Sequence, residues 1–392
     1  MIWSMTALDP NSPELSDIET PALVVDGTGL AANIERMAAA ARRAGVALRP
    51  HAKTHKSPDI ARRQLHSGAV GIACATIREA EDMIAAGIPD MLITSPVVGA
   101  DKVQRLVELH RRSAVMLSVD HPSQADDISA ALGSDDMPLA LLVDVDIGQA
   151  RTGVTSAEEC LALARHIQAA PRLRFVGLQG YAGHVQHIIA AQERQQAVHE
   201  AGAILRACAD RLKADGLAPA VVSGSGTGAS AFDLDAGCYT ELQVGSYVFM
   251  DADYGRLRER DGAPLPYENA LFVLATVISI NRAGQATVDA GTKALAVNGP
   301  PPDLIIGVPD GSSYTFAGDE HGTITLPPSA SAPTLGSRVL IDATHCDPTV
   351  NLHDGYHAAT GDGTLAHWPI VGRYRSTVPK SPLKRAAFPA LL

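Results

Sequence analysis

The chain has 392 residues, 46% of them hydrophobic, which is enough for one large domain and a smaller one. Its net charge of −11, from 43 acidic and 32 basic residues, argues against a surface for nucleic acids or anionic membranes. The five cysteines are odd in number and form no CxxC pair, which disfavours a disulfide framework and indicates a reducing, cytoplasmic compartment.

The N-terminal segment has no basic region followed by a long apolar run, so no secretory signal peptide is expected. No segment of the sequence approaches the roughly 20 apolar residues that a membrane span requires. We therefore expect neither a membrane partner nor a nucleic-acid partner.

Between about residues 22 and 250, short apolar runs alternate with amphipathic stretches that end near a glycine, as helices often do. Strands alternating with helices are typical of a parallel sheet, and eight strands close a (β/α)8 barrel. Because 22–26 is also strand-like, a doubly wound open sheet is the alternative. The eight predicted barrel strands are residues 46–53, 70–75, 91–95, 114–120, 139–146, 175–181, 220–226 and 241–249.

After about residue 268 the pattern changes to β-like segments joined by linkers rich in Pro and Gly. Helical periodicity nearly disappears, which indicates a second, antiparallel β domain. The predicted α/β architecture is therefore a barrel over residues 22–267, followed by a C-terminal β domain over 268–392 that includes residues 1–21.

The first candidate site residue is Lys53 in RPHAKTHK, which follows the first of the eight predicted barrel strands. Catalytic side chains of barrels gather at the C-terminal ends of the strands. A partly desolvated lysine beside the cationic His51, His55 and Lys56 has a lowered pKa and can form a Schiff base with an aldehyde. A solvated basic loop is the alternative interpretation.

Arg151 follows the predicted strand 139–146 in a loop flanked by glycines. It is placed either to hold an anionic oxygen or to pair with Asp144 or Asp146. The segment VVSGSGTGAS (221–230) suits backbone N–H groups that converge on a phosphate, at a position where barrels often bind one. It matches no nucleotide-binding motif, and most such glycine-rich turns are only turns.

Tyr181, His184 and His187 come at the end of the predicted strand 175–181, in LQGYAGHVQH. The two histidines are three positions apart, so they can share one face of a helical turn. They are candidates for general bases or metal ligands, and ordinary polar residues are the alternative.

The segment HCD follows the strand-like RVLIDA near the end of the chain. In an extended backbone, His345 and Asp347 point to the same side and Cys346 points away, and Pro348 favours that conformation for the residue before it. An imidazole and a carboxylate suit Mn²⁺, Mg²⁺ or Zn²⁺, with water completing an open coordination shell. A strand-to-turn segment with incidental polar residues is the alternative.

Together these segments resemble the D-threonine aldolase and D-serine dehydratase group of fold-type III pyridoxal-phosphate enzymes, which are distant relatives of the alanine racemases. The ordered set is specific although each motif alone is not, and it runs from residue 21 to about residue 372. The matching motifs are RPHAKTHK, GQARTGV, LQGYAGHVQH, SGSGTG, ELQVGSYVFMDADYG, DEHG and HCDPTVNLHDG.

The resemblance implies pyridoxal phosphate in the barrel and a divalent metal, Mn, Mg or Zn, in the β domain. It makes Lys53 the Schiff-base lysine and His345 with Asp347 the metal pair. The base is either His187, by motif position, or a metal-bound hydroxide. The spacing His-x-Asp is that of the aldolase branch, whereas the dehydratase branch has His-x-Cys. The other cofactor contacts that it implies are Arg151, Tyr181, Ser225, Gly226, Thr227, Tyr239 and Gln243.

The activity implied by the resemblance is that of a carbon–carbon lyase. Such an enzyme cleaves D-3-hydroxy amino acids to glycine and an aldehyde by retro-aldol cleavage of the Cα–Cβ bond, and the family suggests a homodimer. The alternatives are a D-serine or D-3-hydroxyaspartate dehydratase, a racemase-like enzyme without metal, and a non-catalytic carrier of the cofactor. Two departures from the family pattern near the cofactor, Cys74-Ala75-Thr76 and Ala182, bear on substrate size.

Overall fold

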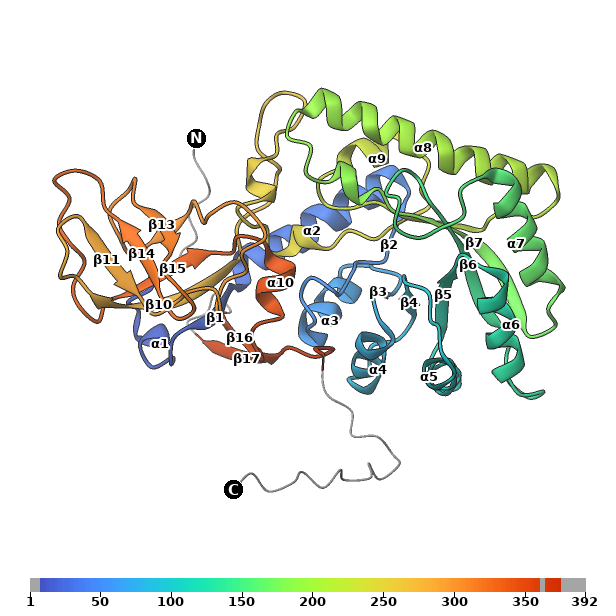
Figure 1. Cartoon of the computed structure of the whole chain (residues 1–392), viewed down its shortest axis with the longest axis horizontal. Helices are drawn as coiled ribbons and strands as arrows, with labels where there is room; N and C mark the ends of the chain where they lie inside the picture. Colours follow the sequence, from blue (N-terminus) through green and yellow to red (C-terminus); the bar gives the residue numbers. More distant parts are fainter. Residues whose placement is uncertain (1–7, 360–363, 375–392) are drawn as a thin grey trace, which may run out of the picture.

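The computed structural model describes residues 8–359 and 364–374, which fold around two sheets (Figure 1). The first sheet is parallel, and its eight strands coincide with the eight barrel strands predicted from the sequence. In sheet order these are β2 (Ala47–Leu48), β9 (Glu241–Leu242), β8 (Val221–Gly224), β7 (Leu173–Gly180), β6 (Leu139–Val145), β5 (Val115–Val119), β4 (Met91–Ile93) and β3 (Ile72–Cys74).

Backbone hydrogen bonds connect the two ends of this sheet. The amides of Val70 and Ala73 donate to Leu48 and Pro50, and the amide of Ala52 donates to Ala73, at 2.8–2.9 Å. The sheet therefore closes, and the predicted (β/α)8 barrel is confirmed.

The barrel strands are buried on both faces, which explains their continuous apolar sequences. Along β3, Ile72 and Cys74 pack in the large core beneath the helices, whereas Ala73 between them belongs to a separate cluster. Residues of a strand alternate between faces, so that cluster fills the inside of the barrel. Its buried members are Ala73, Leu92, Ala140, Leu142 and Val176.

Helices alternate with the barrel strands along the chain, as the amphipathic stretches predicted. Their ends follow local capping rules: the Asp26 carboxylate accepts from the first amides of α2, and Thr76 with Glu79 forms a capping box on α4. The helices are α2 (Gly27–Ala44), α3 (Pro58–His66), α4 (Ile77–Ala85), α5 (Ala100–His110), α6 (Pro122–Ala131), α7 (Ala157–Ala169), α8 (Ala191–Ala214) and α9 (Ser230–Ala236).

The second sheet has nine strands, antiparallel except for the parallel pair β1 and β16, and the short helix α1 (Pro13–Ser16) precedes it. The predicted C-terminal β domain is therefore confirmed. Its strands are β1 (Ala22–Asp26), β10 (Leu271–Ser279), β11 (Gln285–Val288), β12 (Ile305–Ile306), β13 (Ser313–Phe316), β14 (Gly322–Thr325), β15 (Arg338–Asp342), β16 (Gly355–Ala359) and β17 (Leu365–Pro369).

The strand-like segment 22–26 is β1, and it lies between β10 and β16 rather than in the barrel. The domain boundaries at 22–267 and 268–392 remain a prediction. In the structure, β1 belongs to the second sheet, and the chain then enters α2. The α2 helix then runs from that sheet to the barrel (Figure 1).

The loop after β2 is attached to the second sheet by several hydrogen bonds. Tyr356 of β16 donates its hydroxyl to the carbonyl of His55 at 2.6 Å, and the amide of Val371 donates to Lys56 at 2.8 Å. The Lys56 ammonium is buried and pairs with Glu79 at 2.6 Å. These contacts fix the loop that carries Lys53 between the two sheets.

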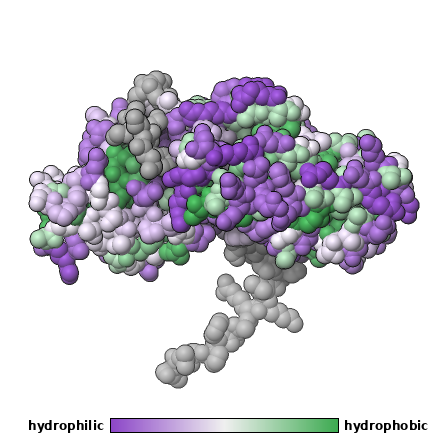
Figure 2. Space-filling view, turned by 90° about the horizontal axis from the view of Figure 1, so that it is seen from above, coloured by the Kyte–Doolittle hydropathy of each residue, from purple (hydrophilic) through white to green (hydrophobic). Residues whose placement is uncertain are grey.

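No helix in residues 8–359 and 364–374 is both long enough and apolar enough to cross a membrane. On the face shown in Figure 2, hydrophilic side chains cover most of the surface and apolar ones lie in small areas between them.

Candidate active site

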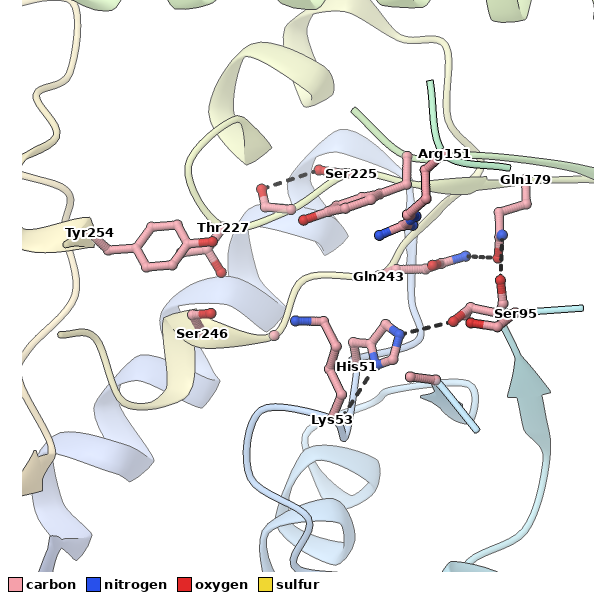
Figure 3. A pocket seen from close by; sticks show the side chains of 15 residues that line it. His51, Lys53, Ser95, Arg151, Gln179, Ser225, Thr227, Gln243, Ser246 and Tyr254 are labelled. Atoms are coloured by element: carbon pink, nitrogen blue, oxygen red, sulfur yellow. Dashed lines mark hydrogen bonds between the residues drawn. The ribbon is translucent and has the colours of Figure 1, made fainter. Parts of the chain in front are cut away.

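One cavity at the C-terminal ends of the barrel strands collects most of the predicted site residues. Seven of them line it: Lys53, Arg151, Tyr181, Ser225, Gly226, Thr227 and Gln243. Lys53 enters from the loop after β2, and Arg151 and Ser225 approach from the opposite side (Figure 3). The remaining lining residues are His51, Ala75, Thr94, Ser95, Gln179, Gly245, Ser246 and Tyr254.

Lys53 is partly exposed to this cavity, and its ammonium contacts the carboxylate of Asp347. Burial lowers the pKa of Lys53, but the Asp347 carboxylate outweighs it and the pKa lies above its usual value. The lowered pKa predicted from cationic neighbours is therefore wrong for this structure. Two of those neighbours face elsewhere, since Lys56 pairs with Glu79 and the ring of His55 accepts from the amide of Ser57 at 3.0 Å.

The predicted phosphate turn is compact and faces the cavity. Ser225 has a φ of +75°, and a Cβ on Gly226 would lie 2.5 Å from the side-chain oxygen of Gln186. Gln186 is fully buried and accepts a hydrogen bond from the amide of Ala229 at 3.2 Å. Only glycine therefore fits at position 226 without displacing Gln186. Because glycine has no side chain, the backbone of the turn can lie close to a molecule in the cavity.

Arg151 does not form the structural ion pair that the sequence left open. Asp144 accepts hydrogen bonds from Thr152 and Gln179, at 2.7 and 2.9 Å, and Asp146 accepts from backbone amides of its own loop. The Arg151 guanidinium instead lies over the ring of Tyr181, 5.5 Å from its centre. It can therefore bind an anionic oxygen in the cavity.

Gln243 and Tyr239 occupy different positions, although both are predicted cofactor contacts. The Gln243 amide donates to Ser223 at 2.9 Å within a buried network and lines the cavity. The Tyr239 hydroxyl donates to the carbonyl of Gly180 at 3.1 Å, and its ring is buried outside the cavity lining.

The predicted metal pair lies where the second sheet meets the barrel. His345 has an extended backbone, but Cys346–Val350 form the short helix α10, so the extended conformation expected at Asp347 is wrong. Pro348 fits in the first turn of that helix, where its missing N–H has no partner to lose. Asp347 nevertheless points to Lys53, and Cys346 is fully buried.

His187 approaches the same place from the barrel side. Its ring centre lies 6.2 Å from that of His345 and 5.3 Å from that of Tyr254, which lines the cavity. His184 is separated from it: its amide donates to the Gln149 side chain at 2.7 Å, and its ring lies over Gly148. Of the two histidines, His187 is thus the one beside the metal pair.

Two carboxylates beside these rings had no assigned role in the sequence analysis. Asp251 Oδ2 lies 2.9 Å from His345 Nδ1, and Asp253 Oδ2 lies 2.9 Å from His187 Nδ1. Their motif, MDADYG, was part of the resemblance, but no sequence pattern indicates which histidines they face.

The residues present fit both groups that the resemblance implies. An amine, a guanidinium and a glycine-containing turn converge in one cavity, as the aldehyde, phenolic oxygen and phosphate of pyridoxal phosphate require. Nδ1 of His345 is hydrogen-bonded to Asp251. This leaves Nε2 of His345 and the Asp347 carboxylate as a ligand pair for a divalent ion. The potential ligand atoms of Asp251, His345 and Cys346 also lie within 4.8 Å of one another.

Comparison with known families covers both parts of the chain. Residues 25–253 match the family described as alanine racemase, N-terminal domain, and residues 270–359 match the family described as putative serine dehydratase domain.

Individual proteins match nearly the whole chain. It is 43% identical over 365 residues to a D-threonine aldolase of Arthrobacter sp, covering 93% of this chain and 95% of that protein. It is 38% identical to a 3-hydroxy-D-aspartate aldolase of Paracoccus denitrificans (strain Pd 1222), covering 91% and 93% of the two chains. The crystal structure of a D-threonine aldolase from Filomicrobium marinum superimposes with a TM-score of 0.87 at 40% identity, covering 92% of this chain and 97% of that one.

Proposed function

The chain belongs to the D-threonine aldolase family, and we propose that it is a metal-dependent pyridoxal-phosphate lyase that cleaves D-3-hydroxy amino acids to glycine and an aldehyde. The observation that carries this proposal is the contact of Lys53, which lines the cavity, with Asp347. The rings of His345 and His187 pack against Tyr254, which also lines the cavity. A molecule of the size of threonine can reach an amine-bound cofactor and a metal ion at the same time in such a site.

Different residues of the cavity would bind different parts of the cofactor. Lys53 would hold its aldehyde carbon, Arg151 its phenolic oxygen, and the turn Ser225–Thr227 its phosphate through backbone N–H groups. Pyridoxal phosphate, when bound, supplies an electron sink for the pair of electrons that the broken Cα–Cβ bond releases. Tyr181, whose ring lies beneath the Arg151 guanidinium, would restrict the orientation of the pyridoxal ring.

The residues at the metal pair act on the 3-hydroxyl of the substrate. His345 Nε2 and Asp347 would hold a divalent ion, which would lower the pKa of a hydroxyl bound to it. His187 then accepts that proton through Nε2, since its Nδ1 is occupied by Asp253. Loss of the hydroxyl proton drives formation of the aldehyde carbonyl as the Cα–Cβ bond breaks, and Cα takes up a proton before glycine is released.

A dehydratase is the second candidate, and the match of residues 270–359 to a putative serine dehydratase domain is the observation in its favour. The same parts would then act differently: Lys53 would remove the Cα proton, and the metal ion would assist departure of the 3-hydroxyl as hydroxide. The carboxylate at position 347, where the dehydratase branch has a cysteine, favours the aldolase.

Product analysis with D-threonine separates the two candidates. Incubation with pyridoxal phosphate and manganese should give acetaldehyde and glycine in equal amounts if the protein is an aldolase. Formation of 2-oxobutanoate and ammonia would instead support the dehydratase, and activity that persists with EDTA would favour a racemase-like enzyme without metal. No turnover of any D-amino acid would support the non-catalytic carrier.

We also propose that the protein works in the cytoplasm as a homodimer and that its ion is manganese, magnesium or zinc. The reducing compartment agrees with free cysteines, of which Cys74, Cys160, Cys208 and Cys346 are buried. Light scattering of the holoenzyme tests the dimer, and reactivation of the metal-stripped protein by each ion tests the choice of metal.

A further inference from the structure

The short segment 251–253 lies between the two histidines of the candidate site. It is anchored to the second sheet, because the amide of Ala252 donates to the carbonyl of Ala343 at 2.9 Å. Its two aspartates face different histidines, Asp251 facing His345 and Asp253 facing His187. The segment therefore contacts the candidate metal ligand and the candidate base at once.

Asp251 is fully buried, and both of its carboxylate oxygens accept hydrogen bonds. Oδ2 accepts from His345 Nδ1 at 2.9 Å and from the amide of Cys346 at 2.8 Å, while Oδ1 accepts from the amide of Tyr254 at 2.8 Å. An ionised carboxylate only accepts hydrogen bonds, so Nδ1 of His345 must carry the hydrogen. In the neutral ring, the lone pair is then on Nε2, the atom left for a metal ion.

Asp253 has the same relationship to His187, with Nδ1 and Oδ2 2.9 Å apart. Its side chain is 23% exposed, so it is less constrained than Asp251. The ring of Tyr254 lies 5.3 Å from His187 and 6.2 Å from His345, centre to centre, and the two histidine rings lie 6.2 Å from each other. The three rings form one wall, and each imidazole is held by one carboxylate.

We infer that Asp251 and Asp253 are positioning residues that fix the Nδ1–H tautomers of His345 and His187, so that both Nε2 atoms face the same substrate hydroxyl. This inference rests on the proposed roles of the two histidines, one as metal ligand and one as proton acceptor. Asp251 acts on metal affinity, whereas Asp253 acts on proton transfer, and the two effects are separable by measurement.

The substitution Asp251→Asn tests the first effect. An asparagine has one oxygen and one NH₂ group for three donors on opposite sides, so in either orientation its NH₂ meets a donor. We expect the Kd for Mn²⁺, measured by calorimetry on the full-length protein with bound pyridoxal phosphate, to rise about 10- to 100-fold. The visible absorbance of the bound cofactor should not change.

The substitution Asp253→Asn tests the second effect. We expect the Kd for Mn²⁺ to stay within about twofold of the original, while kcat for D-threonine cleavage falls roughly 10-fold or more with little change in KM. Asp253→Glu, which keeps a carboxylate, should recover part of kcat.

Asp342→Asn is the matched control. Asp342 is a fully buried aspartate of β15, three residues before His345, and it accepts from the amide of Leu304 at 3.3 Å. Its variant should leave both the Mn²⁺ affinity and kcat unchanged. If Asp251→Asn does not give folded holoenzyme, Asp251→Ser removes the carboxylate with a smaller side chain and should weaken Mn²⁺ binding in the same way.

The outcomes distinguish this inference from the proposed function. If D-threonine is not cleaved but Asp251→Asn weakens Mn²⁺ binding and Asp342→Asn does not, the aldolase proposal fails and the role of Asp251 stands. Unchanged Mn²⁺ affinity in Asp251→Asn would overturn the positioning role of Asp251. An unchanged kcat in Asp253→Asn would overturn that of Asp253. Complete loss of Mn²⁺ binding in Asp251→Asn, with normal cofactor absorbance, would instead make Asp251 a direct metal ligand.

Discussion

The ammonium of Lys53 contacts the carboxylate of Asp347, 294 positions further along the chain. The first belongs to the loop after β2 of the barrel, and the second belongs to α10 beside the second sheet. The contact brings the candidate Schiff-base amine and one of the candidate metal ligands together. The chemistry proposed for this protein depends on that relationship.

Lys53→Ala should abolish the visible absorbance that pyridoxal phosphate acquires on binding, because no other amine lines the cavity as described. Lys56→Gln is the matched control from the same loop, since Lys56 faces Glu79 and the carbonyl of Gly372. Its absorbance should persist. Absorption spectra of both variants with added cofactor test this expected difference. A visible band in Lys53→Ala would refute the role of Lys53.

Gly226→Ala should weaken cofactor binding by about 10-fold or more, because the new Cβ would lie 2.5 Å from Gln186 and must displace the turn or the glutamine. Adding Gln186→Ala should restore part of the affinity by making room. Gly133→Ala is the control, since its nearest neighbour would lie at 3.4 Å. Equilibrium titration of each variant with pyridoxal phosphate gives the Kd values. Equal affinities for Gly226→Ala and the original protein would contradict the phosphate role of this turn.

Arg194→Met should lower the free energy of unfolding by about 2–4 kcal/mol. Its buried guanidinium donates to the carbonyls of Ile188 and Arg258 and so joins the loop after His187 to the loop after Tyr254. Arg211→Ala, on the same helix, removes an exposed pair with Glu158 and should leave the free energy of unfolding nearly unchanged, because solvent screens such pairs. Urea denaturation of both variants tests the difference, and equal stabilities would contradict it.

His55 should make the protein less stable in mild acid. Burial lowers the pKa of its ring from 6.5 to about 4, so the unfolded chain binds a proton more readily than the folded one. Stability from this group is complete above pH 6.5 and falls as the pH decreases towards 4, by about 3 kcal/mol at most. Urea denaturation of the full chain between pH 7 and pH 4 should show a shallower decline for His55→Gln than for the original protein.

The sequence predicts the barrel strands well because strands buried on both faces are continuous apolar runs, as β6 illustrates. It does not predict the sheet to which β1 belongs. The segment ALVVD has the same composition as a barrel strand, and its neighbours β10 and β16 are set by tertiary packing. Local sequence contains no information on such pairings.

Within the candidate site, the sequence motifs propose Lys53, His345 and Asp347, and the fold brings Lys53 into contact with Asp347. The raised pKa of Lys53 was missed because its cause is a carboxylate distant in sequence. Asp251 was missed for the same reason, since its partner His345 lies 94 positions away. Electrostatic environments and positioning contacts arise from tertiary structure, so a single sequence cannot reveal them.

The account depends most on Lys53 and the pair His345–Asp347 acting on one molecule. Crystals of the holoenzyme soaked with manganese and D-threonine, with data collected at the manganese absorption edge, test this directly. We predict one anomalous peak beside His345 and Asp347, with the substrate hydroxyl next to it and the substrate amine at the cofactor held by Lys53. A peak elsewhere, or a substrate that reaches only one of the two groups, would contradict the account.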